Sequence, residues 1–424
     1  MKSFFTSLAT NALLAVLALA QAPHYTVVDL GTLPGGTSSM ANYVSNSRLI
    51  GGNAADAAGT QQAILWAGPF RINLGTRGLN SGIFGINDSG QIAIQAEIPT
   101  RDPNQENFCG YGTGLECIAV LWQRGLAIPL PTLGGNNATI GNINAKGEIP
   151  GVAENNVLAT DCPKGKLPNG NGPQVLNFEP VVWGPKPGTI RELKRLPGDT
   201  VGVALWINDN SQATGASGTC ANTEPPPFTA GAHAVLWDAD GTPHDLGNLG
   251  GNSGGTGLAI NNKGQVVGAS SKTNGSTLSN GTGAFLWTSA HGMQDLGTLP
   301  GDTASGALMI NDPGDIVGIS LDASGNPRAV LWHNGVMGDL NDLAPSSPLF
   351  LIFPSAINSR GEISGFGATE KGDLHAFLAV PDNRPPDRAA ENAEARAPLT
   401  DDVRKLIRER LPVSPLGLRP KEPR

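Results

Sequence analysis

The chain has 424 residues, including 57 glycines and 33 prolines, and only 15% of its residues are charged. Its formal net charge of −8 disfavours nucleic acid as a partner, because a phosphate backbone is bound by a basic surface. At about 100 to 200 residues per domain the length suggests two or three units, but the sequence repeats described below run without a break and favour a single one.

The first 20 residues have the pattern of a secretory signal peptide. Lys2 precedes an apolar run at residues 13–20, which is well short of the ~20 residues that a helix needs to cross a bilayer. Cleavage after Ala20 is favoured over cleavage after Ala22, which would leave Pro23 at the new amino terminus. We therefore expect residues 1–20 to be removed, no membrane span, and a secreted protein, either periplasmic or extracellular.

A tetrapeptide of the form Ala-x-Leu-Trp recurs along the rest of the chain. Five copies are close matches and two are looser, with spacings of 45 to 61 residues. The copies lie at 63–66, 119–122, 180–183, 234–237, 284–287, 329–332 and 376–379. Self-similarity at such a period is the signature of a repeat architecture.

Each repeat contains three further short apolar runs bounded by turn residues, which predicts four strands per unit, A to D. Strand A ends in an Ile-Asn-like pair, strand B reads Gly-x-Val-Val-Gly, strand C carries the Trp tetrapeptide and strand D carries Asp-Leu-Gly. The connection Asn-x-x-Gly from A to B is typical of a tight turn, so we expect its asparagines to shape hairpins rather than bind ligands. These are Asn46, Asn87, Asn144, Asn208, Asn261, Asn311 and Asn358.

Four antiparallel strands per unit with a mean period near 50 predict an all-β fold, a seven-bladed β-propeller spanning residues 24–380. The last unit lacks strand D, and the segment 25–31 at the mature amino terminus supplies the missing Val-Val-Asp-Leu-Gly pattern. The amino-terminal strand is therefore expected to complete the last blade and close the ring. The alternative is an open, linear array of sheets whose first unit simply starts at a different strand of the repeat.

The recurring tryptophan is interpreted as core, because a large ring at a fixed position in every blade can fill the gap between neighbouring sheets. Six of the seven tryptophans occupy this register, whereas Trp206 falls on strand A of the fourth blade. A ring of aromatics that stack on sugars is the alternative.

The repeats resemble the HAF family of bacterial extracellular repeats, named for a His-Ala-Phe triplet. His375, Ala376 and Phe377 form the triplet itself, and the Asp-Leu-Gly-Thr-Leu, Ile-Asn and Gly-x-Val-Val-Gly runs are best preserved between residues 245 and 332. The second and third units depart most, since Ile94 replaces the closing glycine and Pro180 the alanine. The resemblance implies an exported repeat protein and supplies no catalytic residues.

Four cysteines in an exported chain of this kind predict two disulfides, with three possible connectivities. We favour Cys109 with Cys117 and Cys162 with Cys220, because both bridges then close within or between neighbouring loops. The cysteines fall in long B-to-C connections of the second, third and fourth units, at residues 95–118, 153–179 and 216–232.

Elaborated loops on a rigid scaffold are where function usually lies, so these three connections are the predicted binding surface. Its candidate residues are Arg101, Asp102, Tyr111, Asp161, Lys164, Lys166 and Glu224. The simpler alternative is that these loops are tolerated surface insertions, which the disulfides protect from proteolysis.

The predicted A strands contain no Asp, Glu, His, Lys or Arg, although acid–base catalysis and metal binding need such groups at one spot. We therefore expect a non-catalytic, monomeric binding propeller for a glycan, a peptide or a cell-surface protein, with no metal or cofactor. A propeller-type hydrolase or lyase that acts through the same loop face is the alternative.

The carboxyl-terminal segment 381–424 is rich in charge and proline, which favours a mostly disordered tail. Within it, residues 401–411 could form a short helix capped by Thr400, with Val403, Leu406, Ile407 and Leu411 along one side.

Overall fold

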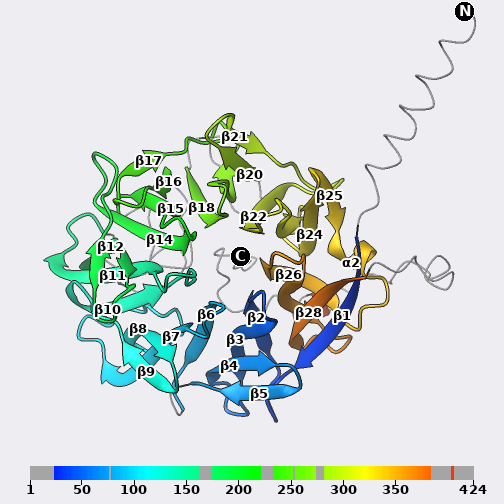
Figure 1. The fold of residues 1–424 in the computed structure, drawn as a ribbon, viewed down its shortest axis with the longest axis horizontal. Coiled ribbons are helices and arrows are strands. Elements are labelled where there is room, and N and C mark those ends of the chain that lie inside the picture. Colours follow the sequence, from blue (N-terminus) through cyan, green and yellow to red (C-terminus); the bar gives the residue numbers. More distant parts are fainter. Residues whose placement is uncertain are drawn as a thin grey trace, which may run out of the picture.

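The computed structural model describes residues 23–75, 78–162, 173–220, 233–251, 254–273, 281–382 and 403–404. The predicted signal peptide, most of the tail and the candidate residues Lys164, Lys166 and Glu224 lie outside these ranges. The described residues form seven four-stranded antiparallel sheets arranged in a ring, so the predicted seven-bladed propeller is confirmed (Figure 1).

The first four blades follow one another in chain order, each from the inner strand A to the outer strand D. Blade 1 comprises β2 (Ser39–Val44), β3 (Leu49–Ala55), β4 (Gln61–Ala67) and β5 (Phe70–Asn73). Blade 2 comprises β6 (Ser81–Ile86), β7 (Ile92–Arg101), β8 (Leu115–Gln123) and β9 (Leu126–Pro129). Blade 3 comprises β10 (Gly134–Ile140), β11 (Ile149–Leu158), β12 (Leu176–Trp183) and β13 (Ile190–Glu192). Blade 4 comprises β14 (Val201–Ile207), β15 (Ala213–Gly218), β16 (His233–Trp237) and β17 (Pro243–Asp245).

The last three blades keep the same order. Blade 5 comprises β18 (Gly255–Ile260), β19 (Val266–Ser271), β20 (Thr282–Thr288) and β21 (Gly292–Asp295). Blade 6 comprises β22 (Ala304–Ile310), β23 (Ile316–Leu321), β24 (Pro327–His333) and β25 (Val336–Asp339), followed by the short helix α2 (Leu340–Leu343). Blade 7 comprises β26 (Phe350–Ile357), β27 (Ile363–Ala368), β28 (Leu374–Asp382) and, as strand D, β1 (His24–Gly31).

The ring is closed by the two ends of the described propeller. β1 runs antiparallel to β28, from the pair His24–Asp382 to the pair Gly31–Ala376. This is the offset by one strand that the sequence predicted, and β1 covers the edge of β28 that would otherwise be open.

The A-to-B turns follow the predicted Asn-x-x-Gly pattern. In blade 2, the Asn87 side chain accepts hydrogen bonds from the backbone of Ser89 and Gln91, and Gly90 has φ of 76°. Blade 1 differs from the prediction, because Ser45 rather than Asn46 holds the first turn position. The Ser45 hydroxyl accepts the N–H of Leu49 at 3.0 Å, so serine does the same local work as asparagine.

The glycine that closes the strand B motif is required by close approach of the neighbouring strand. A Cβ on Gly268 would lie 2.0 Å from the carbonyl oxygen of Thr256 and 2.8 Å from the Phe285 ring. Blade 2 accommodates Ile94 at the corresponding position, where its side chain is buried in the core.

Four of the six tryptophans in the repeat register are core residues, with exposed fractions of 0–2%: Trp66, Trp183, Trp237 and Trp332. Three of them donate a hydrogen bond to the connection that leaves the preceding blade, as Trp332 does to the carbonyl of Leu296 at 3.0 Å. Trp122 and Trp287 are only half-buried, so the core prediction holds fully for four blades.

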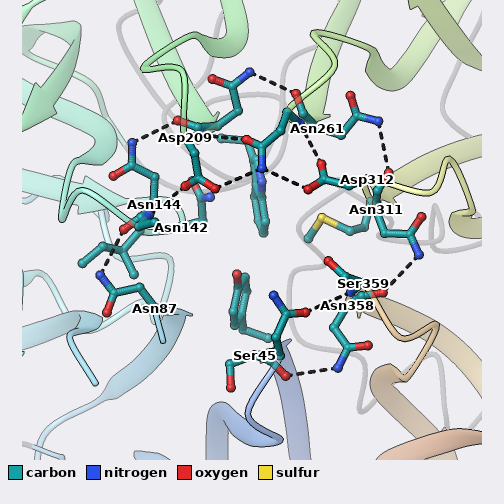
Figure 2. Close-up of a pocket in the computed structure, with 18 of the residues that line it drawn as sticks. Ser45, Asn87, Asn142, Asn144, Asp209, Asn261, Asn311, Asp312, Asn358 and Ser359 are labelled. Carbon is teal, nitrogen blue, oxygen red and sulfur yellow. Dashed lines mark hydrogen bonds between the residues drawn. The ribbon is translucent and has the colours of Figure 1, made fainter. Parts of the chain in front are cut away.

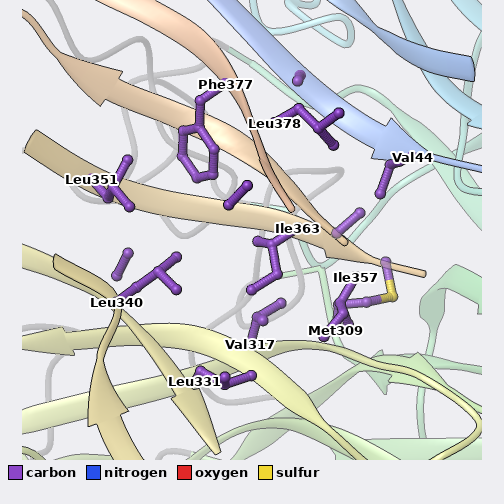
Figure 3. Close-up of a cluster of buried hydrophobic side chains, with 14 of the residues drawn as sticks. Val44, Met309, Val317, Leu331, Leu340, Leu351, Ile357, Ile363, Phe377 and Leu378 are labelled. Atoms are coloured by element: carbon purple, nitrogen blue, oxygen red, sulfur yellow. The ribbon is translucent and has the colours of Figure 1, made fainter. Parts of the chain in front are cut away.

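Between blades the core is aliphatic and aromatic. Figure 3 shows part of its largest cluster, where side chains from β24, β26 and β28 pack together across blades 6 and 7. This continuous packing fixes the blades relative to one another and so defines the channel along the ring axis.

Candidate functional site

The A-to-B turns meet around one end of the central channel and form a ring of hydrogen bonds. The side-chain amide of each turn asparagine donates to the backbone carbonyl of the equivalent residue in the next blade, at 2.9–3.1 Å. The series runs in the order Asn87, Asn144, Asn208, Asn261, Asn311, Asn358 and Ser45 (Figure 2). The repeated asparagines therefore join neighbouring blades as well as shape hairpins.

A second tier of polar groups lies one residue further along each turn, nearer to solvent. The side-chain amide of Asn262 donates to the carboxylates of Asp209 and Asp312, at 3.0 Å in each case. The carboxylates in turn accept backbone N–H groups, since Asp209 binds the N–H of Ala145 and Asp312 that of Asn262. On the other side of the mouth, the Asn46 side chain accepts the N–H of Ser359 at 3.0 Å.

Two aromatic side chains from opposite blades meet below these tiers. Tyr43 of β2 and Trp206 of β14 are stacked, with ring centroids 5.9 Å apart and an interplanar angle of 29°. Burial and the negative charges of Asp88 and Asp209 raise the pKa of the Tyr43 hydroxyl, so it stays a neutral hydrogen-bonding group. The pair forms an aromatic floor across the channel.

Together these groups line a funnel of about 160 Å³, open to solvent, which we call the axial funnel. Its wall contains the turn residues of all seven blades, with Tyr43, Trp206 and Met309 among its non-turn residues. This volume is less than the ~300 Å³ of a typical drug-sized pocket. The funnel can therefore admit the end of a ligand rather than a whole large one.

The charged groups in the funnel wall are carboxylates: Asp88, Asp209 and Asp312. Lys146 lies close by, but its ammonium group donates to the Ser211 hydroxyl at 2.9 Å. This arrangement repels anions and suits neutral polyhydroxylated or cationic groups.

The predicted loop surface lies at the opposite end of the ring, because B-to-C connections leave each blade on the face opposite the A-to-B turns. Much of what the sequence predicted as loop is strand, since β7 and β11 each extend to ten residues. The favoured disulfide pairing is confirmed: Cys109 bonds to Cys117 within blade 2, and Cys162 to Cys220 between blades 3 and 4.

The described candidate residues of this surface have different environments. Arg101 is exposed at the end of β7, whereas Tyr111 packs against the cluster that contains Phe108 and Cys109. Asp161 accepts hydrogen bonds from the Thr200 hydroxyl at 2.5 Å and from the N–H of Cys220. The structure thus brings Asp161 to the second disulfide, where it fastens two loops together.

Asp102 is only 3% exposed and belongs to a buried acidic cluster with Glu106 and Glu154. All six carboxylate oxygens of the cluster accept hydrogen bonds, mainly from the side chains of Asn137 and Gln174 and from backbone N–H groups. Burial and the charge of Glu106 raise the pKa of Glu154 to about 9. The cluster therefore holds a proton at neutral pH and joins the blade 2 loop to blade 3, and its three residues are buried.

The sequence interpretation missed the axial funnel. Trp206 was visible as the one tryptophan outside the repeat register, and Tyr43 stands at the same distance before its turn as Trp206 does. The seven inner strands, all of them described, contain no ionisable side chain except the phenol of Tyr43, as the sequence indicated. The funnel charges come instead from the turns, one residue past the repeated asparagine.

Among the residues that the structure describes, no helix is both long and apolar enough to cross a bilayer. No protein-family model and no curated protein matches the chain. Similar solved structures include a Mycobacterium tuberculosis puromycin-hydrolysing peptidase, with 11% identity and a TM-score of 0.48 over 86% of this chain. The chain spans 55% of that peptidase.

Two smaller structures match over most of both chains. The Aleuria aurantia lectin, in complex with a fucosyl-GlcNAc disaccharide, has 12% identity and a TM-score of 0.33 over 82% of this chain and 97% of its own. YCF48 bound to D1 peptide has 10% identity and a TM-score of 0.44, over 86% and 97%.

Proposed function

We propose that this protein is an exported, non-catalytic binding propeller that takes the terminal sugar of a glycan into the axial funnel. The observation that carries the proposal is the Tyr43–Trp206 pair beneath two tiers of amides and carboxylates. Aromatic rings offer an apolar surface to the C–H groups of a sugar, and planar amides and carboxylates bind its hydroxyl groups.

The charge and size of the funnel support the same ligand class. Its carboxylates disfavour phosphate, sulfate and other anionic ligands, and its volume of about 160 Å³ suits a single ring with the rest of the chain in solvent. Because the funnel is built from turns locked by the asparagine ring, binding requires little ordering of the protein.

Catalysis at this site is disfavoured by the way its carboxylates are held. Asp209 and Asp312 both accept hydrogen bonds from the Asn262 side chain and from backbone N–H groups, so their oxygens already have partners within the protein. A glycosidase needs a pair of carboxyl groups that are free to act on the substrate. The hydrolase or lyase alternative would have to use the loop face.

The loop face of blades 2–4 is the second candidate, as a surface for a protein partner. At the end of the extended β11, Val157 and Leu158 are 52% and 64% exposed, close in sequence to the disulfide at Cys162. Exposed apolar residues on a braced hairpin are suitable anchors for a protein interface.

Export and family membership belong to the same proposal. Two disulfides are typical of proteins outside the reducing cytosol, and residues 1–20 supply the leader pattern. Membership of the HAF family is supported by a contact between two of its motifs. The imidazole of His375, from the His-Ala-Phe triplet, lies 2.9 Å from the carboxylate of Asp29, from the Asp-Leu-Gly motif.

A glycan array probed with the mature protein tests the sugar-binding proposal. We expect Trp206→Ala and Asp88→Ala to weaken the best glycan at least tenfold, while Phe70→Ala, an exposed aromatic on β5, leaves affinity unchanged. Asp88 is an exposed turn residue, so its substitution tests the funnel without disturbing the core. Absence of any glycan ligand, or binding that survives both funnel variants, contradicts the proposal.

A further inference from the structure

The wall of the axial funnel carries negative charge that no basic residue of the wall neutralises. Its second tier contributes the carboxylates of Asp88, Asp209 and Asp312. Among the described residues that line the funnel there is no Lys, Arg or His. An acidic cavity that is open to solvent attracts cationic ligands and raises their local concentration.

The basic residues of the same turns have other partners or other positions. Arg48 and Arg360 both pair with the Glu362 carboxylate. Lys146 is bonded to a serine hydroxyl, as described above, and Lys263 holds the equivalent turn position in blade 5. This turn position does not line the funnel in either blade. The charge of the funnel carboxylates is therefore left for a ligand to balance.

Asp88 differs from the other two carboxylates in having no hydrogen-bond donor. Asp209 and Asp312 each accept a backbone N–H and the side-chain amide of Asn262. Asp88 accepts no hydrogen bond from any residue that the structure describes, and it is exposed in the funnel wall. Both of its carboxylate oxygens are thus available to a ligand.

The aromatic floor also offers polar groups to a ligand. Neither the Tyr43 hydroxyl nor the Trp206 indole N–H is hydrogen-bonded to a described residue. Burial is the main cause of the raised pKa of Tyr43, and the charges of Asp88 and Asp209 add to it, so both carboxylates lie close enough to act on the floor. An ammonium group in the funnel is attracted by these carboxylates and, above an aromatic ring, by the ring itself.

The spacing of the carboxylates disfavours a metal ion as the cation. Asp88, Asp209 and Asp312 follow the inner strands of blades 2, 4 and 6. Among the described residues, three acidic side chains have oxygens within 4.8 Å of one another in the buried acidic cluster but not in the funnel. An organic ammonium group, whose N–H groups point in several directions, suits separated acceptors better.

We propose that the axial funnel selects a terminal sugar with a free amino group, a 2-amino-2-deoxyhexose in its ammonium form. Asp88 is the specificity-determining residue, because its carboxylate is free to accept hydrogen bonds from the ammonium group. The inference rests on the proposed function, since it requires that a sugar ring occupies the funnel.

The chemistry of the amino group distinguishes this sugar from its neutral relatives. A hydrogen bond from an ammonium group to a carboxylate is about twice as strong as one between neutral groups, so the amine is preferred over a hydroxyl. N-acetylation removes the charge and adds bulk in a funnel of about 160 Å³, a volume that suits a single ring. The hydroxyl groups of the ring can accept the Trp206 N–H and pair with the Tyr43 hydroxyl.

Three oligosaccharides that differ only at C2 of the non-reducing terminal ring test the selection. One carries an ammonium group there, one a hydroxyl and one an acetamide, and calorimetric titration of the full mature chain measures the affinity of each. We expect the ammonium form to bind about tenfold more tightly than the hydroxyl form and the acetamide form to bind most weakly. Added salt should reduce the preference, because it screens the carboxylates.

Two variants separate the funnel from the acidity of the whole chain. Asp88→Asn should lower the preference for the ammonium form over the hydroxyl form about fivefold. Glu370→Gln removes the same charge from an exposed position in the B-to-C connection of blade 7 and should leave the preference unchanged. An equal loss in both variants would assign the preference to net charge and overturn the role of Asp88.

The remaining outcomes distinguish this inference from the proposed function. If the hydroxyl form binds as tightly as the ammonium form and Trp206→Ala abolishes both, sugar binding stands and selection of the amine is overturned. If none of the three forms binds, both proposals are overturned. A lysine peptide that binds more tightly than the ammonium form would show selection of a cation rather than an amino sugar, which also overturns the inference.

Discussion

His375 and Asp29 are 346 residues apart in the sequence, and the imidazole Nδ1 of His375 lies 2.9 Å from the Asp29 carboxylate. Blade 4 repeats the pairing, with His233 Nδ1 at 3.2 Å from Asp245. In both blades a residue at the start of strand C is joined to the Asp-Leu-Gly aspartate of strand D. The repeated motifs thus mark a contact that holds the outermost strand on its blade.

The His375–Asp29 pair is expected to contribute modestly to ring closure, about 0.5–1 kcal/mol, because both side chains are partly exposed. A double-mutant cycle of His375→Ala and Asp29→Ala, followed by chemical denaturation, measures this coupling. Partial burial raises the pKa of Asp29, but hydrogen bonds from His375 and Gly31 outweigh it and lower the pKa. The contribution should therefore persist above the ordinary carboxyl pKa and vanish as acid protonates Asp29. Coupling that is unchanged in acid would contradict this assignment.

The asparagine ring has a serine at one position, Ser45, whose hydroxyl pairs with Ser47 and with the N–H of Leu49 rather than with the carbonyl of Asn87. Ser45→Asn should add the missing hydrogen bond and raise the free energy of unfolding by about 0.5–1.5 kcal/mol. Asn208→Ala should lower it by about 1–3 kcal/mol, since the carbonyl of Asn261 loses its donor. Urea denaturation of both variants checks the pair of predictions, and a destabilised Ser45→Asn would show that the turn of blade 1 has no room for an amide.

The acidic cluster predicts a pH dependence of stability. Burial and the Glu106 charge raise the pKa of Glu154 to about 9, so between pH 4.5 and 9 the unfolded chain has released a proton that the folded protein retains. The free energy of unfolding therefore falls as pH rises through this window. Glu154→Gln should flatten the slope and exceed the wild type in stability near pH 9. Glu370→Gln, at an exposed position, is the control. If the free energy of unfolding changes with pH equally in the wild type and both variants, the acidic cluster is not the cause.

The two disulfides should differ in their effect on stability. In the chain-entropy model, removing the 58-residue crosslink between Cys162 and Cys220 costs about 4 kcal/mol, against about 2.5 kcal/mol for the 8-residue crosslink between Cys109 and Cys117. Thermal unfolding of two variants, each with both cysteines of one disulfide replaced by alanine, tests this order. If removing the Cys109–Cys117 disulfide destabilises the protein more, then this disulfide stabilises the packing of the blade 2 loop in addition to its effect on chain entropy.

A sharp contrast is expected between Gly268 of strand B in blade 5 and Gly306 of strand A in blade 6. Gly268→Ala places a methyl group 2.0 Å from the Thr256 carbonyl oxygen and should cost about 1–3 kcal/mol or more. Gly306→Ala meets its nearest atom at 3.8 Å, an ordinary contact, and should change the free energy of unfolding by less than about 1 kcal/mol. Equal effects in a denaturation experiment would show that strand A moves aside at Gly268.

The architecture was predictable because its signals are local and repeated. Each unit shows its own alternation of strands and turns, and the missing strand D of the last unit pointed to the segment that includes Asp29. The turn of blade 1 was misassigned by one residue, since Ser45 and Asn46 can both begin such a turn. The disulfide pairing followed from loop order alone.

The axial funnel and the acidic cluster were not predictable, because each depends on residues from different blades. Tyr43 and Trp206 meet only when blades 1 and 4 face each other across the axis. Asp102 was expected on the binding surface because it falls in the long B-to-C connection of blade 2, but Asn137 and Gln174 of the next blade surround its cluster with donors. Such contacts depend on how the sheets are packed, which no single repeat contains.

The pairing of β1 with β28 also sets an order of events during synthesis. Blades 1 to 6 each consist of consecutive strands and can form as the chain emerges, whereas blade 7 has to wait for residue 382 while β1 stays without its partner. Closure is therefore the last and most non-local step, and it should limit the folding rate. Until that step the amino-terminal strand is an open edge, and this is when the newly made chain is most exposed to mispairing with other copies.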